Sequence, residues 1–94
     1  MATVMLMHWP EVSKEQYEQV RHSVKWEENP PDGAKFHTAW MSGDGFHVLD
    51  LWESKEHFEI FLQDRLAAGI AAAGVAGQPQ VEFSESLSIF APNV

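Results

Sequence analysis

The most informative segment of the sequence lies near its middle and reads KFHTAWMSGDGFHVLDLW, residues 35–52. Two largely apolar runs flank the turn-forming residues Ser42-Gly43-Asp44-Gly45. Tight turns between antiparallel strands require positive φ at their central residues, and Gly and Asp tolerate this conformation. The segment therefore predicts a β-hairpin with strands at residues 35–41 and 46–53.

Two registers of this hairpin fit the turn. If Gly43 and Asp44 are its central residues, His37 pairs with Asp50; if the centre lies one residue later, His37 pairs with Trp52 instead. Both registers give the same two faces, because side chains alternate with period two along a strand. The first face holds Phe36, Thr38, Trp40, His47, Leu49 and Leu51. The second holds His37, Ala39, Met41, Phe46, Val48, Asp50 and Trp52. The first face is the more apolar, so we expect it to lie under the helices.

The segments on the N-terminal side of the hairpin predict a strand and a helix. Residues 3–9 form an apolar run that Pro10 ends, which is typical of a strand buried on both faces. Ser13, followed three residues later by Gln16, forms the capping box of a helix that ends by about Trp26. The Pro- and Gly-containing residues 29–33 predict a loop.

The segments on the C-terminal side predict a second helix and a last strand. Ser54 caps a helix whose buried stripe includes Phe58 and Phe61, and the Ala-rich residues 67–73, with Gly69 inside, predict a weakened or broken continuation. Residues 81–89 alternate between apolar and polar, as a half-buried strand does. We expect its apolar residues to join the first face: Val81, Phe83, Leu87 and Ile89. The element order β-α-β-β-α-β predicts a single α+β domain over residues 1–94 with a ferredoxin-like fold, a four-stranded antiparallel sheet with two helices on one face.

Composition excludes several classes of partner and site. The chain has 94 residues and a formal net charge of −8, which argues against nucleic acid and anionic membranes as partners. It has no Cys, so disulfides, thiolate nucleophiles and Cys-based zinc sites are excluded, and a reducing cytoplasmic location fits. We expect no signal peptide, because the apolar N-terminal run lacks a basic region and a cleavage site.

The second face of the hairpin suggests self-association. It combines the polar His37 and Asp50 with Met41, Phe46 and Trp52, which is too much apolar surface to leave in water. A face of this kind is expected to meet a partner or to line a cavity. Two copies of the chain that close face to face would do both, so we expect a homodimer.

His37 and Asp50 are the best candidates for chemistry. A carboxylate beside an imidazole fixes its tautomer and stabilises the imidazolium, which suits a general base near neutral pH; a purely structural contact between subunits is the alternative. His8, at the end of the first strand, would complete a metal-binding set with this pair if it faced the same cavity. No ligand spacing in the sequence supports such a site, so we expect no stoichiometric metal. Tyr17 packs in the core or points its hydroxyl into a pocket.

The sequence resembles a known family of proteins. The resemblance is carried by Met-His-Trp-Pro at residues 7–10, Phe36-His37, Asp-x-Trp-Glu-Ser at residues 50–54, and the following helix with Phe58 and Phe61. These features are similar to those of dimeric α/β-barrel proteins, and more narrowly of the antibiotic-biosynthesis-monooxygenase-like group. The resemblance covers residues 4 to about 90. It implies that two four-stranded sheets pack into a barrel, and that the activities to consider include cofactor-independent oxygenation, haem degradation, isomerisation and decarboxylation.

Together these observations predict a small homodimeric enzyme that uses no cofactor. The reaction would be oxidation, or base-driven isomerisation or cyclisation, of an apolar aromatic or polyketide-like molecule, with His37 as base and Asp50 as its orienting partner. The expected substrate-binding residues are His8, Tyr17, Met41, Phe46 and Trp52. The alternatives are a non-catalytic ligand-binding or stress-related dimer, and a haem- or metal-binding barrel. An enclosed cavity containing His37 and Asp50 would favour the enzyme.

Overall fold

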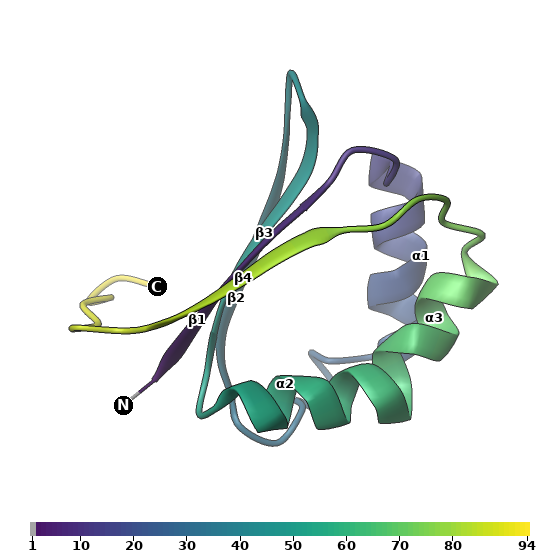
Figure 1. The fold of residues 1–94 in the computed structure, drawn as a ribbon. Helices are drawn as coiled ribbons and strands as arrows, with labels where there is room; N and C mark the ends of the chain where they lie inside the picture. The colour runs from purple at the N-terminus through teal and green to yellow at the C-terminus, as the bar shows by residue number, and fades with distance from the viewer. Residues whose placement is uncertain (1) are drawn as a thin grey trace.

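The computed structural model describes residues 2–94 and has the predicted ferredoxin-like order of elements. The strands are β1 (Thr3–Trp9), β2 (Ala34–Ser42), β3 (Gly45–Trp52) and β4 (Gln80–Glu85). They form one antiparallel sheet in the order β2-β3-β1-β4. All the helices lie on one side of the sheet (Figure 1). The prediction of the fold class is therefore confirmed.

The first helix, α1 (Lys14–Val24), begins and ends for local reasons. The hydroxyl of Ser13 accepts a hydrogen bond from the Gln16 amide at 3.1 Å, and the Gln16 side chain accepts one from the Ser13 amide at 3.0 Å. This reciprocal pair confirms the predicted capping box. Lys25 adopts a left-handed conformation with φ 56°, which ends the helix just before Trp26 and leaves that residue outside it.

The second helical segment is longer than predicted and irregular at a different place. It consists of α2 (Lys55–Phe61), a π-helical turn at Leu62–Leu66, and α3 (Ala67–Ala72). Ser54 caps α2 as predicted, but the chain stays helical through the Ala-rich part. A Cβ atom on Gly69 would lie 3.0 Å from Val24 Cγ1, so this glycine allows α3 to approach α1 closely. None of the helices in the described part of the chain is long and apolar enough to cross a membrane.

The hairpin adopts the first of its two possible registers. His37 is the partner of Asp50, Met41 is the partner of Phe46, and Ser42 lies opposite Gly45. Gly45 has φ 115°, a conformation in which a side chain is strained. The expected positive φ at the central residues is wrong, because neither Gly43 nor Asp44 has it, and the left-handed residue is Gly45 after them. The register nevertheless places His37 and Asp50 side by side on one face of the sheet.

The prediction of which face the helices cover is wrong. They cover the second face of the hairpin: Phe46, Val48, Asp50 and Trp52 are between 3% and 6% exposed. From here this is the covered face; it also holds Met5, Met7, Trp9, His37, Val81 and Phe83. Asp50 can be buried there because both of its carboxylate oxygens have hydrogen-bond partners. Val81 and Phe83 lie under the helices as expected. They share a face with the second set of hairpin residues, however, and not with the first set as predicted.

The other side of the sheet has no helix over it, and we call it the open face. It holds Val4, Leu6, His8, Thr38, Trp40, His47, Leu49, Leu51, Glu82 and Ser84. Leu6 is 42% exposed and Trp40 43% exposed. The prediction that β1 is buried on both faces is therefore wrong for the single chain. In Figure 1 the open face is the side of the sheet that points away from α1, α2 and α3.

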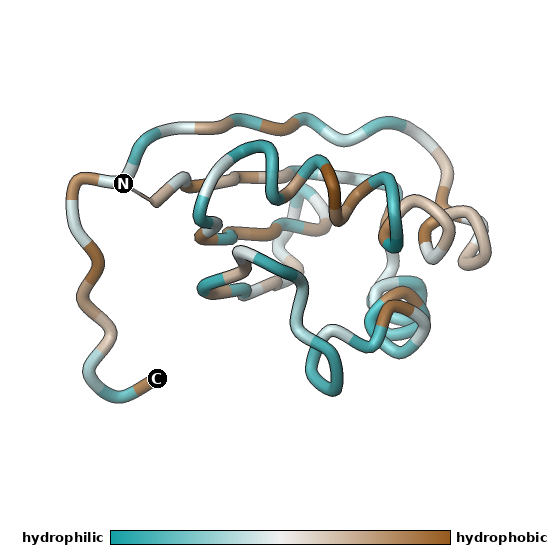
Figure 2. Tube along the Cα trace, turned by 90° about the horizontal axis from the view of Figure 1, so that it is seen from below, coloured by the Kyte–Doolittle hydropathy of each residue, from teal (hydrophilic) through white to brown (hydrophobic). Residues whose placement is uncertain are grey.

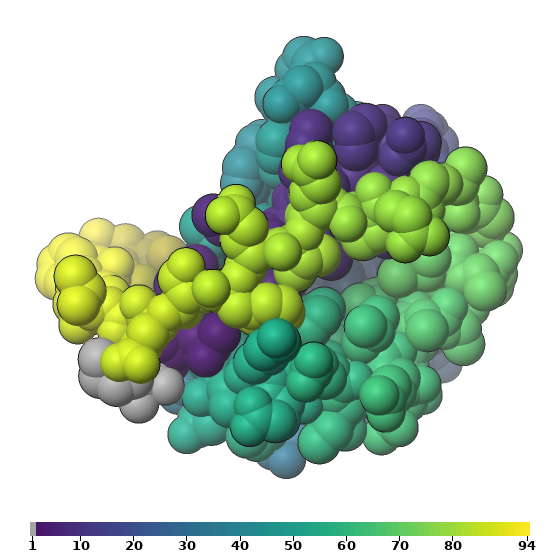
Figure 3. All heavy atoms as spheres, viewed as in Figure 1, coloured from purple at the N-terminus to yellow at the C-terminus, as the bar shows by residue number. Residues whose placement is uncertain are grey.

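The last strand is shorter than predicted, because β4 ends at Glu85 and not at residue 89. It pairs with β1, which begins at Thr3, directly opposite Glu85, and one more backbone hydrogen bond, from the Ser86 amide to the Ala2 carbonyl at 2.8 Å, follows this last pair. Beyond this point Leu87 is 95% and Phe90 87% exposed, and neither joins the core. Figures 2 and 3 show the C-terminal tail extending away from the sheet and the helices.

Candidate functional site

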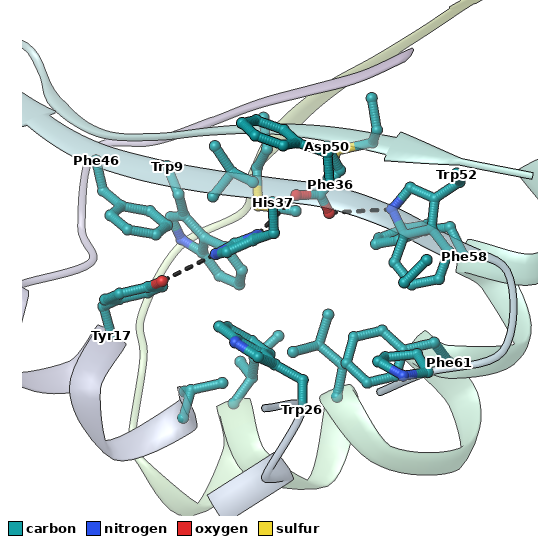
Figure 4. Close-up of a pocket in the computed structure, with 18 of the residues that line it drawn as sticks. Trp9, Tyr17, Trp26, Phe36, His37, Phe46, Asp50, Trp52, Phe58 and Phe61 are labelled. Carbon is teal, nitrogen blue, oxygen red and sulfur yellow. Dashed lines mark hydrogen bonds and ion pairs between the residues drawn. The ribbon is translucent and has the colours of Figure 1, made fainter. Parts of the chain in front are cut away.

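A pocket of about 260 Å³ lies between the covered face of the sheet and the helices. Its walls are largely apolar and include Met7, Val20, Phe46, Val48, Phe61 and Leu66. His37 and Asp50 also line it, and Figure 4 shows both side chains on the sheet side with the helices opposite. An apolar pocket with a few convergent polar groups is the usual form of a small-molecule site.

The two predicted catalytic residues are in direct contact inside this pocket. The His37 Nδ1 atom lies 2.7 Å from Asp50 Oδ1, and the Trp52 indole donates a hydrogen bond to Asp50 Oδ2 at 3.0 Å. The Asp50 side chain is 9% exposed and that of His37 is 29% exposed. The carboxylate is thus buried with both of its oxygens hydrogen-bonded, while the imidazole is the more exposed member of the pair.

Tyr17 of α1 adds a third member to this hydrogen-bonded chain. Its hydroxyl lies 2.8 Å from His37 Nε2. Since an ionised carboxylate only accepts, Nδ1 of a neutral His37 donates to Asp50, and Nε2 carries the lone pair that accepts from Tyr17. Burial raises the pKa of Tyr17 to about 12, against a partly opposing effect of the Arg21 charge. Tyr17 therefore stays protonated at neutral pH and can serve as a hydrogen-bond donor.

Trp26 is the pocket residue whose position the sequence did not reveal. Its ring centre lies 4.6 Å from that of His37 and 6.0 Å from that of Tyr17. Trp26 follows the left-handed Lys25, so its direction depends on how the chain leaves the helix and not on the helical period. The only signal in the sequence is that a large aromatic residue stands just beyond a helix end.

The structure places the five expected substrate-binding residues in different parts of the molecule. Tyr17, Phe46 and Trp52 line the pocket. Met41 is on the same face as His37, but it lies near the hairpin turn and is 47% exposed. His8 is on the open face, where it pairs with His47, so it does not line the pocket, and the metal-binding set considered for His8, His37 and Asp50 does not come together. His8 lies on that face because of the register between β1 and β3, which the sequence did not specify.

Comparisons with known proteins find similarity in structure alone. No protein-family model matches this sequence. No curated protein matches it either.

Several solved structures share the fold over nearly the whole chain. One is a "putative antibiotic biosynthesis monooxygenase" from Caulobacter crescentus, with 21% identity, 93% of this chain and 90% of that chain covered, and a TM-score of 0.67. A second is SnoaB, a cofactor-independent oxygenase from Streptomyces nogalater, with 13% identity, 94% of each chain covered, and a TM-score of 0.63.

A third structure is a dimeric ferredoxin-like protein of unknown function from Thermobifida fusca, with 14% identity, 89% of this chain and 90% of that chain covered, and a TM-score of 0.65. At such identities the likeness establishes a common fold. The resemblance to antibiotic-biosynthesis-monooxygenase-like proteins that the sequence suggested is thus confirmed at the level of the fold.

Proposed function

We propose that this protein is a cytoplasmic, homodimeric enzyme of the antibiotic-biosynthesis-monooxygenase-like group. It carries out the cofactor-independent oxidation, or the base-driven isomerisation or cyclisation, of an apolar aromatic or polyketide-like small molecule. The observation that carries this proposal is the His37–Asp50 pair, 2.7 Å apart at the wall of an apolar pocket.

The first chemical step is the transfer of one proton to His37. A phenol, or a carbon next to a carbonyl, gives its proton to the Nε2 lone pair and becomes a phenolate or an enolate. The imidazolium that forms is stabilised by the ionised Asp50 carboxylate on its other nitrogen. Tyr17, which occupies Nε2 without a ligand, then donates its hydrogen bond to the new oxyanion.

The fate of that anion distinguishes the candidate reactions. In isomerisation or cyclisation, His37 returns the proton to a different atom of the same molecule. In oxidation, molecular oxygen accepts electrons from the carbanion. One oxygen atom becomes the new carbonyl of the product, and the other leaves as water with the two hydrogens of the oxidised carbon.

The lining of the pocket favours a flat and apolar ligand. Trp26, Tyr17 and Phe46 surround His37, and aromatic rings pack well against a planar molecule. The polar groups converge at one place, around His37 (Figure 4). A ligand is therefore oriented with its acidic group toward His37 and its rings toward Phe61 and Leu66.

The open face supports the homodimer, whereas the second face of the hairpin, on which the sequence argument rested, is covered by the helices. Leu6 and Trp40 are both more than 40% exposed there, beside the apolar Val4, Leu49 and Leu51. An apolar sheet face of this kind is unfavourable in water and is typical of an interface. The dimeric ferredoxin-like protein from Thermobifida fusca shows that a chain with this fold can pair with itself.

The experiment is a panel of phenols, anthrone-like compounds and β-dicarbonyl compounds, followed by oxygen uptake and absorbance. His37→Gln should lose roughly 10²–10⁴-fold in turnover, the usual contribution of general acid–base catalysis. The matched control is His22→Gln, because His22 is exposed on α1 outside the pocket. Wild-type turnover in His37→Gln would remove this residue from the mechanism.

A second candidate function is binding of the same class of ligand without turnover. It is favoured by one observation: both ring nitrogens of His37 are already engaged, by Asp50 and by Tyr17. In this case the wild type should bind members of the panel, seen as a change in Trp fluorescence, and transform none of them. Turnover that depends on His37 would exclude this candidate.

A further inference from the structure

A second group of ionisable side chains lies on the open face, on the opposite side of the sheet from His37. His8 of β1 and His47 of β3 are cross-strand partners, and their rings stack with centres 4.5 Å apart and planes 4° apart. Asp44 lies in the turn between β2 and β3. None of these three residues lines the pocket that contains His37.

The coordinating atoms of the three side chains converge. His47 Nε2 lies 2.7 Å from Asp44 Oδ1, and His8 Nε2 lies 3.7 Å from Asp44 Oδ2. One nitrogen or oxygen atom of each residue lies within 4.8 Å of the others. Two imidazoles and one carboxylate are thus gathered around a common point, although His8 and Asp44 are 36 residues apart in the sequence.

We propose that His8, Asp44 and His47 form a binding site for a divalent transition-metal ion of the zinc and copper class. Imidazole nitrogens suit these ions, and two imidazoles with one carboxylate leave further coordination positions for water. The proposal does not depend on the proposed reaction at His37, because the two groups lie on opposite faces of the sheet. In the proposed homodimer, which uses the open face, the site lies at the end of that face next to the hairpin turn.

Binding requires a small rearrangement of side chains. A metal ion lies close to the plane of each imidazole that binds it, so one of the two stacked rings must turn. Trp40 stacks on His47 with ring centres 5.3 Å apart and planes 9° apart, which restrains that ring. His8 and Asp44 have more room, since their side chains are 28% and 65% exposed. An ion would replace the hydrogen bond of His8 Nε2 to the Asp44 backbone carbonyl, 2.8 Å long, and that of His47 Nε2 to Asp44 Oδ1. The strand backbones, which are fixed by the sheet ladder, stay in place.

The position of the ligands explains why no spacing in the sequence marks the site. Metal sites read from sequence usually place ligands a few residues apart on one element, whereas here they come from two strands and the turn of a hairpin. The pairing of His8 with His47 is a consequence of the β1–β3 register. That register brings together two histidines that are far apart in the sequence.

The test is titration of the whole protein with copper(II) chloride, followed by Trp fluorescence and by calorimetry, with zinc(II) chloride as competitor. The wild type should bind one ion per chain, and zinc should displace copper only when zinc is in large excess, because nitrogen and oxygen ligands bind copper(II) more tightly. Trp40 is next to His47, so copper should quench its emission, and Trp40→Phe should remove most of the quenching. His8→Gln and His47→Gln should each weaken binding by at least roughly tenfold, the loss caused even by outer partners of metal ligands.

Two controls make the result decisive. His22→Gln, on the exposed side of α1, should bind copper as the wild type does, and Asp44→Asn tests the carboxylate at a turn position that accepts Asn. Far-UV circular dichroism checks that each variant is folded; if His47→Gln is not, His8→Gln and Asp44→Asn decide. Binding that is equal in the wild type and in these two variants, or lost equally in His22→Gln, would overturn the proposal.

Discussion

Neighbouring residues on each strand point to opposite faces of the sheet, and the two faces have different physical roles. On β3, Val48, Asp50 and Trp52 are buried against the helices, whereas their neighbours Leu49 and Leu51 point to the side without helices. The covered face contains the more polar residues of the hairpin. Apolar content alone therefore does not identify the face that a single chain buries.

Each face also carries a histidine beside an aspartate, in different surroundings. His37 is held between a buried carboxylate and a tyrosine at the wall of an apolar pocket. His8 and His47 stack on each other next to a turn carboxylate that is 65% exposed. The first arrangement favours proton transfer to an organic ligand, and the second favours coordination of a metal ion.

The largest expected difference between the faces is in stability. Trp52→Ala removes a side chain that is 3% exposed, packs edge to face on Phe58 and donates to Asp50. We expect a loss of about 3–5 kcal/mol in the free energy of unfolding. Leu51→Ala, one residue away on the open face, should lose less, because within one chain no helix covers that face. Urea denaturation of both variants measures the difference, and equal losses would contradict the assignment of faces.

The next effect concerns the homodimer. Leu6→Lys places a charge on the open face, where cross-strand Glu82 makes it acceptable in a single chain. We expect the wild type to sediment at twice 10.6 kDa at micromolar concentration and the variant at 10.6 kDa. Ile60→Lys is the control, because Ile60 is 57% exposed on α2, away from the sheet. A wild type that sediments as a monomer would contradict the proposed homodimer.

A smaller effect is expected from Asp50→Asn. The Asn oxygen can still accept from Trp52, but its amide group must donate toward His37 Nδ1, which reverses the tautomer of the ring. The protein should stay folded and lose roughly 1–3 kcal/mol in the free energy of unfolding. The Nε2 lone pair would then be lost, so turnover should fall as in His37→Gln. Unchanged turnover with the same substrate would show that Asp50 does not orient the base.

The smallest effect is in the alkaline range. Tyr17 is the only tyrosine, so absorbance at 295 nm reports its ionisation alone. Burial raises its pKa to about 12, and the ordinary value is about 10. The folded state therefore keeps a proton that the unfolded state loses, and the stability present below about pH 10 is lost as the pH rises toward 12. A midpoint near pH 10 in protein that circular dichroism shows to be folded would place Tyr17 in solvent.

The fold was predictable because its signals are local. The Ser13 and Ser54 caps and the glycine-containing turn act within a few residues, and the structure contains all three. The turn also brought His37 next to Asp50, so their contact followed from one of the two registers considered. The end of β4 was not predictable from its own alternating pattern, because it depends on where β1 begins.

The covered face was predicted wrongly for an energetic reason. The sequence shows that Asp50 is polar, but it does not show that Trp52 and His37 satisfy both of its oxygens. Once satisfied, a polar group can be buried at modest cost, so the polarity of Asp50 does not keep this face of the hairpin in water. The same long-range information, the β1–β3 register, was needed to place His8 beside His47.

The central claim is that the ligand binds on the covered face beside His37, and the indole N–H signals of the four tryptophans test it most directly. Trp26 and Trp52 line the pocket, whereas Trp40 lies on the open face. In two-dimensional ¹H–¹⁵N spectra, a phenol or anthrone-like ligand should shift the Trp26 and Trp52 signals and leave the Trp40 signal in place. A shift confined to Trp40 would contradict the account.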